Sequence, residues 1–446
     1  MATTGVASRP ADLILGRWER LPRWPFSVGV LGIVGIGYFF AFFDVVNIGI
    51  VLPAIMKAWH LTTPPAVVIS VGLLGYVVAL AISVISDRYG RRPALLLTGT
   101  LIGIGSLLTG VANSVALLAV GRFIVGMGTG SAISQVTVYI GELAPAKLRG
   151  RLTAVANIFA FAGVALTPFI GLAIVPHWAL GWRVMLVIPV LGAVVMWLGS
   201  RQIVETPRWL ALHGRLEEAE AIVGRAEQRL TQLGVSLPPA EPVALPERSA
   251  VSWRLLIERR YFPYLALFFV AWFVFYIFNY TYLGLGTTLF VHQGYTIATS
   301  IMFVAIGSLG YGLAPWVCMV LNDRYERKHL AVFWGILCGV ALAVMGIAPS
   351  PATLIIFGFL ADLANVAFTV TSYTLNAEHF PTAVRTTAMA LGEGLGHFGG
   401  AVGPILSLSI LHAAGFSGVF LFIGAMVAIS GVLLAGARKT TGQALG

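Results

Sequence analysis

Long apolar runs alternate with short polar loops along most of the chain. A helix that crosses a bilayer needs about 20 mostly apolar residues in succession, and twelve runs of this kind follow one another. The pattern therefore predicts an all-α membrane protein with twelve transmembrane helices. The runs lie near residues 28–52, 66–86, 94–112, 115–140, 153–175, 183–200, 262–289, 297–320, 330–348, 351–377, 386–410 and 416–436.

One longer polar stretch, residues 201–260, separates the sixth run from the seventh. It contains GRLEEAEAIVGRAEQRL, in which apolar residues recur at helical spacing and predict an amphipathic helix. A proline-rich linker follows this helix. The expected segments are a cytoplasmic leader at 1–26, a six-helix bundle at 27–200, the cytoplasmic link at 201–260, a second six-helix bundle at 261–437 and a cytoplasmic tail at 438–446.

The composition agrees with a membrane protein. Hydrophobic residues make up 58% of the chain and charged residues only 10%, whereas a soluble domain carries roughly 25% charged residues. The net charge of +10 could indicate nucleic-acid binding, but the basic residues gather in every second loop, which is a topology signal. We therefore expect no nucleic-acid partner, a surrounding lipid bilayer, a location in the cell membrane, and both termini in the cytoplasm.

The first 26 residues lack the basic end, apolar stretch and cleavage site of a signal peptide. We expect them to form a cytoplasmic leader, with an amphipathic helix on the membrane surface. Cys318 and Cys338 both lie in apolar runs, so we expect free thiols rather than a disulfide.

The charged hexapeptide DRYGRR at 87–92 returns as DRYERK at 323–328, 236 positions later. The same offset relates Glu142 to Glu378, Pro145 to Pro381, Arg149 to Arg385 and Pro168 to Pro404. We infer an internal repeat of a six-helix unit and two pseudo-symmetric halves. Parallel repeats of this kind occur in one large class of transporters.

At these motifs the chain resembles the major facilitator superfamily. DRYGRR is similar to the signature D-R/K-x-G-R/K-R/K that follows the second span of that superfamily. GRFIVGMGTG and GELAPAKLRGR resemble the fourth span and the next loop of its sugar-porter and metabolite–proton symporter branches, and ETPRWL resembles their P-E-S-P-R-W-L. The resemblance covers about residues 25–438, and it departs at Ser83 and Glu326, where the signature has glycine. It implies a major facilitator fold and transport by alternating access.

Charges near the ends of the spans are candidates for a cytoplasmic gate. They could pair across the seam between the halves when the cytoplasmic side is closed, and separate when it opens. The alternative is that they are solvated topology markers, because exposed pairs contribute only about 0–1 kcal/mol each. The candidates are Asp87, Arg88, Arg91, Arg92, Glu142, Arg149, Asp323, Arg324, Glu378 and Arg385.

Two charges inside the spans are candidates for proton coupling. Asp44 and Arg122 lie at similar depths, roughly 12–14 Å from the outer ends of the first and fourth spans. Equal depth allows an ion pair, and protonation of Asp44 would weaken it. In proton-coupled members of the sugar-porter branch an acid and an arginine of these spans play this role, and the positions match. The alternative is a purely structural pair.

Further polar residues in the spans are candidates for substrate binding. Glu393 and His397 lie four residues apart, hence on one helical face, and Asp362 lies in mid-span with Asn365 one turn later. The alternative for each is a polar or aromatic group that packs between helices. The remaining candidates are Asn47, Gln135, Asn157, Tyr276, Asn279, Tyr280 and Tyr282.

The sequence contains no recognisable metal cluster, nucleophile elbow or phosphate loop, so we expect no cofactor and no enzyme activity. The glycine-rich GMGTG lies inside a span, where small residues let helices approach closely. Sugar porters carry Q-Q-x-x-G-x-N in the seventh span, where this chain reads FVFYIFNYTYLGLG. The opening RLPRWPF looks more like the metabolite–proton symporters, which often carry small organic acids, including aromatic carboxylates.

We therefore predict a monomeric secondary transporter that moves a small organic acid together with protons. Two alternatives remain open. One is an exporter of drugs or metabolites in exchange for protons, and the other is a transporter of sugars or organic cations.

Overall fold

The structure is a computed structural model that describes residues 9–243, 253–322, 324–381 and 384–441. In these residues all regular structure is helical. Eleven helical stretches are long and apolar enough to cross a membrane. The last of them, Thr387–Gly436, counts as two spans, because Gly415 inside it has φ 65° and ψ −164° and interrupts the helix. The predicted twelve spans are thus confirmed.

The first bundle contains the first six spans, and three of them are assembled from two shorter helical segments. These helices are α2 (Val28–Ala58), α3 (Ala66–Val78) with α4 (Leu80–Tyr89), α5 (Arg91–Val111), α6 (Val115–Leu143), η1 (Ala146–Leu148) with α7 (Arg149–Ile174), and α8 (Gly181–Val187) with α9 (Val190–Leu198).

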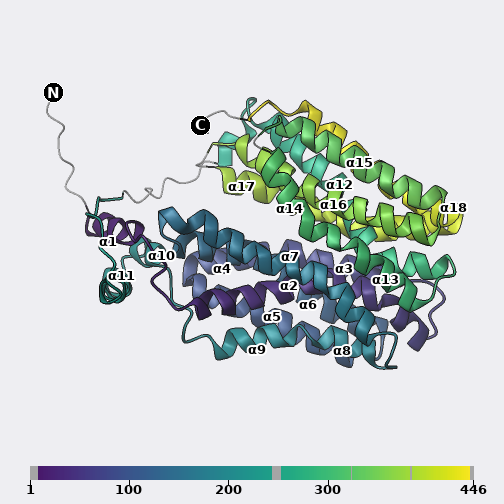
Figure 1. The fold of residues 1–446 in the computed structure, drawn as a ribbon, viewed down its shortest axis with the longest axis horizontal. Coiled ribbons are helices and arrows are strands. Elements are labelled where there is room, and N and C mark those ends of the chain that lie inside the picture. The colour runs from purple at the N-terminus through teal and green to yellow at the C-terminus, as the bar shows by residue number, and fades with distance from the viewer. Residues whose placement is uncertain (1–8, 244–252, 323, 382–383, 442–446) are drawn as a thin grey trace.

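The second bundle contains the other six spans and stacks on the first (Figure 1). Its helices are α12 (Phe262–His292), α13 (Ile297–Gly307) with α14 (Leu309–Leu321), α15 (Arg327–Ile347), α16 (Pro351–Glu378), α17 (Arg385–Met389) with the π-helical turn η3 (Ala390–Gly394), α18 (Leu395–Leu433) and η4 (Leu434–Gly436).

The repeat seen in the sequence is also a repeat of structure. Shifted by 236 positions, the bounds of α5 coincide with those of α15, and the bounds of α6 match those of α16 within one residue. The same ion pair recurs at the same offset: Arg91 pairs with Glu142 at 2.8 Å, and Arg327 pairs with Glu378 at 3.1 Å. In each bundle an Arg–Glu ion pair therefore joins the start of the third span to the end of the fourth span.

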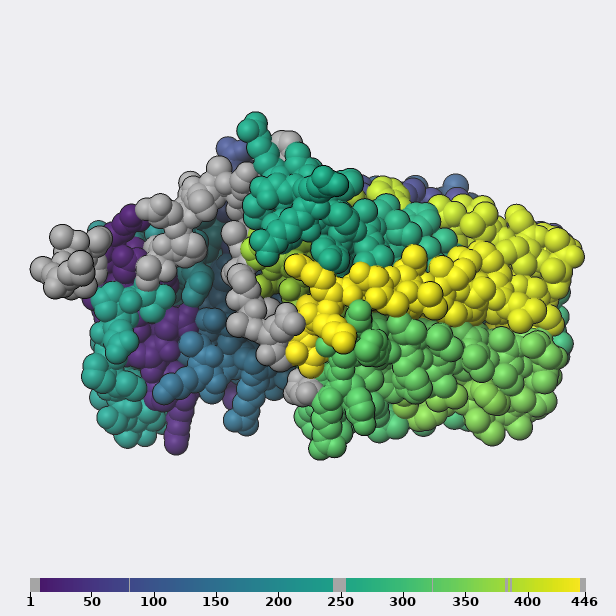
Figure 2. Space-filling view, turned by 90° about the horizontal axis from the view of Figure 1, so that it is seen from above, coloured from purple at the N-terminus to yellow at the C-terminus, as the bar shows by residue number. Residues whose placement is uncertain are grey.

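The chain has one strongly charged end, which we call the basic end. It carries the loop at 87–92, the loop at 144–148 and three α-helices outside the spans. In Figure 2, α1 (purple) and α11 (teal) lie there, beyond the end of the second bundle. The three helices are α1 (Pro10–Glu19), α10 (Pro207–Leu212) and α11 (Leu216–Gln232).

The two bundles touch most closely away from the basic end. Gly49 lies so near the second bundle that a Cβ there would be 1.9 Å from the backbone oxygen of Leu283, and Ser308 donates a hydrogen bond of 3.0 Å to the oxygen of Ala165. Val164 is buried in this contact, whereas Asn157, two turns nearer the basic end on the same helical face, is exposed. The seam is therefore closed at the opposite end and opens toward the basic end.

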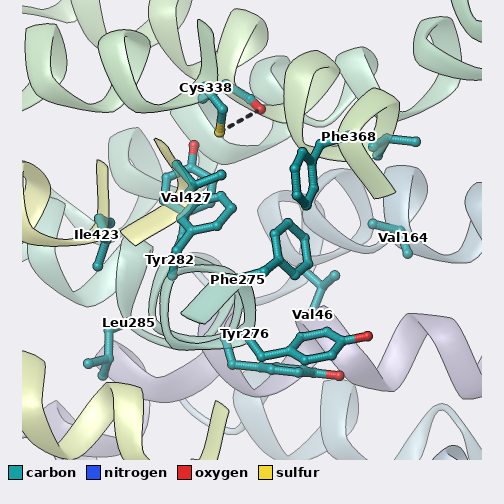
Figure 3. Close-up of a cluster of buried hydrophobic side chains, with 14 of the residues drawn as sticks. Val46, Val164, Phe275, Tyr276, Tyr282, Leu285, Cys338, Phe368, Ile423 and Val427 are labelled. Atoms are coloured by element: carbon teal, nitrogen blue, oxygen red, sulfur yellow. Dashed lines mark hydrogen bonds between the residues drawn. The ribbon is translucent and has the colours of Figure 1, made fainter. Parts of the chain in front are cut away.

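Aromatic residues dominate the core where the bundles meet. Figure 3 shows Val46 and Val164 of the first bundle beside Phe275 and Phe368 of the second. The rings of Phe275 and Phe368 stack with their centroids 5.0 Å apart, which suits the preference of aromatic rings for offset packing. Cys338 donates a weak hydrogen bond to Ala361 close by, and both cysteines are free and buried.

The N-terminal helix does not expose its apolar side to a membrane surface, so that expectation was wrong. Leu15 and Trp18 of α1 are almost completely buried, and α1 contacts α10 and α11. Glu227 of α11 accepts hydrogen bonds from Arg17 and Arg20. Burial raises the pKa of Glu227, but these hydrogen bonds outweigh burial and the pKa lies below its usual range. Burial of apolar area and these ion pairs hold α1 on the predicted amphipathic helix of the link.

The link also caps a transmembrane helix. Glu205 of ETPRWL accepts hydrogen bonds from the backbone N–H groups of Arg91 and Arg92, the first residues of α5. A carboxylate suits a helix start, where N–H groups lack partners. Gly90 makes room for it, because its φ is 117° and a Cβ would lie 2.3 Å from the Glu205 carboxylate. Glu326 at the matching position of the second repeat has φ −63°, so no glycine is needed there.

We predict that Gly90→Ala lowers the melting temperature of the detergent-purified protein by several degrees. Strain at positive φ costs about 1–3 kcal/mol, and the new methyl group would displace the Glu205 cap. Scanning fluorimetry measures this effect. Gly150→Ala is the matched control, since a Cβ at Gly150 meets nothing within 4 Å. Equal melting temperatures for the two variants would contradict this account of the loop.

His379, after the end of α16, is held as a neutral ring. Its Nε2 accepts the backbone N–H of Arg438 at 2.8 Å, so Nδ1 carries the proton and donates to the oxygen of Leu375 at 2.7 Å. Burial, which is the main cause, lowers the pKa of His379 from 6.5 to about 4. Protonation would remove the acceptor for Arg438, which ties the C-terminal segment to the bundle.

A histidine with a depressed pKa stabilises the fold at neutral pH, and that stability is lost as the pH falls from about 6.5 toward 4. The loss from this shift is at most about 3 kcal/mol. We predict that His379→Gln narrows the difference in melting temperature between pH 7.5 and pH 4.5. His329→Gln, which alters an exposed side chain, is the control and should behave like the parent. If the melting temperature of His379→Gln differs between the two pH values as much as that of the parent, His379 does not cause the loss of stability.

Candidate functional site

The first element of the site is a buried ion pair inside the first bundle. Nη1 of Arg122 on α6 donates to both carboxylate oxygens of Asp44 on α2, at 2.9 and 2.7 Å. The side chains are 8% and 2% exposed. Removing one partner of such a pair costs about 3–5 kcal/mol, because the other charge is left buried and alone. The ion pair that the similar depths of Asp44 and Arg122 allow is therefore present, with two hydrogen bonds.

Arg122 also reaches the seam between the bundles. Arg122 lines a small cavity of about 20 Å³ together with Tyr76 of the first bundle and Tyr280 of the second. Nε of Arg122 is buried and has no hydrogen-bond partner among the described residues. The arginine thus holds Asp44 and still has a donor that no described group uses.

The second element is a carboxylate in the second bundle. Glu393 lies in the π-helical turn η3, and such turns inside helices frequently occur at functional sites. Its Oε1 accepts hydrogen bonds from the hydroxyl groups of Tyr276 at 2.5 Å and Tyr373 at 2.7 Å. The Glu393 side chain is 16% exposed. Two donors therefore fix one carboxylate oxygen in a site that is partly open.

His397 connects this carboxylate to the first bundle. Its Nδ1 lies 3.2 Å from the backbone oxygen of Glu393 and 3.6 Å from Oε1. The imidazole packs against the ring of Tyr276, with centroids 4.0 Å apart, and stacks on Tyr76 of the first bundle at 5.3 Å. Tyr76 in turn meets Tyr280 edge-on at 6.1 Å. A row of neighbouring groups thus runs from Asp44 and Arg122, through the cavity that Arg122 lines with Tyr76 and Tyr280, to His397 and Glu393.

A second polar cluster surrounds Asp362 on α16. Asp362 is 2% exposed, and its Oδ1 has no hydrogen-bond partner in the described part of the chain. Together with Tyr282 and Tyr311 it lines a separate cavity of about 20 Å³, against Val164 of the first bundle. Asn365, one turn on, donates to the hydroxyl oxygen of Tyr311 at 3.2 Å. These candidates form a cluster of their own, closed by the contact between the bundles.

Four predicted site residues lie apart from both clusters. Asn47 is completely buried and donates to the backbone oxygen of Met185, and Gln135 points to Ser83. Asn157 is exposed on the open part of the seam, and Asn279 is half-buried on α12. Of these, only Asn157 lies where the seam is open, so we leave the other three out of the proposed site.

Among the described residues, the ion pairs of the gate candidates lie within one bundle or, for Arg149, join the first bundle to α1. Arg91 pairs with Asp87 and Glu142. Glu142 does not pair with Arg149, which binds Glu19 of α1 instead. The remaining candidates are placed as follows: Arg92 donates to the oxygen of Ser200, Arg385 donates to the oxygens of Ala377 and Phe380, Arg88 and Arg324 are exposed, Glu378 pairs with Arg327, and Asp323 lies outside the described residues.

Several residues of these networks were missed in the sequence. Tyr76, Tyr311 and Tyr373 all place a hydroxyl group inside a span, which is the same signal that identified Tyr276. Glu19 and Glu205 lie outside the spans, and no local pattern relates them to Arg149 or to α5. Their partners are 130 and 114 positions away.

Comparisons with known proteins identify the family of the chain. Residues 61–445 match the family model described as "Sugar (and other) transporter". The niacin transporter NiaP of Acinetobacter baylyi is 27% identical over 444 residues, which cover 97% of this chain and 98% of the relative. The putative metabolite transport protein YyaJ of Bacillus subtilis is 27% identical over 422 residues, 94% of this chain and 93% of that protein.

The fold is also that of a solved transporter. The inward-open structure of the xylose transporter XylE from E. coli superposes with a TM-score of 0.72, at 18% identity, over 94% of this chain and 98% of that one. Twelve spans, the repeated halves and the match over residues 61–445 lead to one conclusion. The chain belongs to the sugar (and other) transporter family of the major facilitator superfamily, and it is a membrane transporter of sugars or other small metabolites rather than an enzyme.

Proposed function

We propose that the protein is a proton-coupled symporter of a small organic acid, with an aromatic carboxylate as the preferred substrate. The observation that carries the proposal is Arg122, the cation in the seam, bound to Asp44 and facing a cavity lined by Tyr76 and Tyr280. We further propose that the basic end faces the cytoplasm of a cell-membrane protein, as basic loops do. The structure then corresponds to the state open to the inside.

Coupling follows from the cost of a buried charge. Ionised Asp44 is stable in this buried site only when it is paired with Arg122, and while the pair exists Arg122 is not available to another anion. A proton on Asp44 removes that need, and Arg122 is then free to bind the carboxylate of a substrate. Proton and substrate thus load together, and both leave when the pair forms again. This order makes the proton gradient drive uptake.

Aromatic rings around the site favour an aromatic acid. Tyr76, Tyr276 and Tyr280 surround His397, and Trp272 packs against Tyr276 and Tyr373. A flat substrate ring could stack in the same way, which contributes about 0.5–1.5 kcal/mol beyond the area it buries. The niacin transporter among the relatives gives nicotinate as the first compound to test.

Glu393 is the observation that favours a second candidate, a sugar. Its carboxylate and the hydroxyl groups of Tyr276 and Tyr373 could serve the many hydrogen bonds that sugar hydroxyl groups make. A carboxylate so close would instead repel an anionic substrate. The two candidates therefore differ in what Glu393 contributes.

We propose that the repeated Arg–Glu pairs belong to a gate at the basic end. In this state they lie within each bundle, at 2.8 and 3.1 Å. We propose that these charged ends meet across the seam when the basic end closes. The predicted segment boundaries, with the link at 201–260, remain part of this proposal, as does a monomeric state.

We predict that Asp44→Asn abolishes uphill uptake but preserves downhill exchange. The amide cannot carry the coupling proton, so accumulation of nicotinate in proteoliposomes under a pH gradient should fall at least tenfold, while nicotinate–nicotinate exchange continues. Glu218→Gln, which alters an exposed side chain of α11, is the control and should accumulate like the parent. Undiminished accumulation by Asp44→Asn would show that another group couples the proton.

Glu393→Gln separates the two substrate classes. Removal of the negative charge should leave nicotinate binding intact or strengthen it, whereas a sugar would lose its charged acceptor and bind about tenfold more weakly. The measurement is thermal stabilisation with nicotinate or D-xylose at pH 5.5 and pH 7.5. Ligand at 100 times its dissociation constant adds roughly 2.7 kcal/mol to the folded state.

For an organic acid taken up with a proton, nicotinate should stabilise the parent more at pH 5.5 than at pH 7.5. Stabilisation by D-xylose alone, weakened by Glu393→Gln, would overturn the organic-acid assignment in favour of a sugar carrier.

A further inference from the structure

A large cleft lies at the end of the molecule opposite the basic end. Its volume is about 1130 Å³, and both bundles line it. The first bundle supplies residues between Pro53 and Pro64 and between Val175 and Ala179, and the second supplies residues between Thr288 and Ala298. The contact of Gly49 with Leu283 lies about one helical turn along α2 from Pro53, the first lining residue of the cleft. A solute that moves between this side and Arg122 must pass through the cleft.

The basic side chains that line the cleft are one lysine and three histidines. Lys57 comes from the end of α2, His60 from the loop after it, His177 from the loop after α7, and His292 from the end of α12. All four are exposed. Tyr295, from the loop after α12, is the other titratable residue of the lining, and Trp178 adds an aromatic wall.

No carboxylate opposes these groups. The sequence contains no Asp or Glu in the ranges 45–86, 143–204 and 259–322, or after residue 393, and these ranges contain every residue that lines the cleft. Two more cationic or titratable residues lie outside the lining at this end, Arg183 and His412. Arg183 donates to the oxygen of Gly110 and lies over the ring of Trp182. This end of the protein therefore carries basic side chains with no carboxylate to offset them.

We propose that this cleft is a vestibule that collects small organic anions and becomes more attractive to them as the outside turns acidic. Histidine is the side chain whose charge changes between pH 5 and pH 8, and three histidines line the cleft beside the fixed charge of Lys57. A cleft lined by one sign of charge concentrates ions of the opposite sign. The vestibule thus gains its charge under the condition that supplies the coupling proton.

The electrostatic potential of the cleft and its role in substrate capture can be tested in separate experiments. The electrostatic part, a cleft whose potential rises with acidity, depends only on this end of the protein. The part that makes the collected anion a substrate rests on the proposed function. A probe of the potential that needs no transport therefore tests the first part alone.

The probe is a cysteine in the cleft, Ala179→Cys, in a chain whose two native cysteines are buried. Its reaction rates with an anionic sulfonatoethyl and a cationic trimethylammonioethyl methanethiosulfonate are measured at pH 5.5 and pH 7.5. The ratio of the two rates cancels the reactivity of the thiol and reports the local potential. We expect the anion-to-cation ratio to rise about fivefold on acidification, and the rise to shrink in high salt.

The histidines are tested by adding His60→Gln, His177→Gln and His292→Gln to the same background. The pH-dependent rise should disappear in the triple variant, and each single variant should remove part of it. Glu217→Cys on the exposed surface of α11 is the control and should show little change with pH. A ratio that stays constant in Ala179→Cys, or rises equally in the triple variant, would overturn the vestibule.

Transport then tests the second part. In proteoliposomes the triple variant should raise the KM for nicotinate about threefold at external pH 5.5, with the maximal rate kept and little change at pH 7.5. An unchanged KM at pH 5.5 would show that the collected anion is not the substrate. If the parent does not carry nicotinate at all, the proposed function fails, while the reagent ratio still decides the electrostatic part.

Discussion

The cost of a buried charge is the constraint on which this molecule depends. Asp44 and Arg122 sit in the middle of the first bundle with almost no exposure, and each is tolerable there only because of the other. Two events together remove this dependence: a proton neutralises Asp44, and a different anion pairs with Arg122. Both are chemical events that a transporter can use. The cavity beside Arg122 marks where an anion would bind, and the bundles must move apart there to admit one.

The repeat explains how such a site can change its access from one side to the other. Each bundle is braced at the basic end by the same Arg–Glu pair, and the first is further locked by Glu205 and by α1. Rigid bundles move as bodies, so small changes at the seam become large changes at its ends. The contacts that cross the seam, such as Gly49 with Leu283 and Tyr76 with His397, are the ones that such a movement must break.

Much of the fold was predictable because the bilayer imposes strict rules on sequence. Spans must be apolar and about 20 residues long, so their positions follow from hydropathy, and the offset of 236 positions identified the two halves. The Asp44–Arg122 pair was predictable because few charges occur inside the spans. The structure of the link was only half predictable: α11 follows from its amphipathic pattern, but the docking of α1 on it depends on contacts such as Arg17 with Glu227.

Other features have no local signal. The π-helical turn that presents Glu393 depends on how the eleventh span packs, and Tyr373 reaches the same carboxylate from a different helix. Nothing in the sequence around Arg149 indicates that its partner is Glu19 rather than Glu142. Such pairings are decided by tertiary geometry, and residue type alone leaves several partners equally suitable.

Infrared difference spectroscopy of the protein in liposomes, between pH 7.5 and pH 5.5 with nicotinate present, decides whether Asp44 carries the coupling proton. We expect a carbonyl-stretch band of a newly protonated carboxyl group that is missing in Asp44→Asn, because Asp44 takes up the proton when Arg122 is released. A spectrum in which the same band persists in Asp44→Asn would assign the proton to another carboxylate and exclude Asp44 as the coupling site.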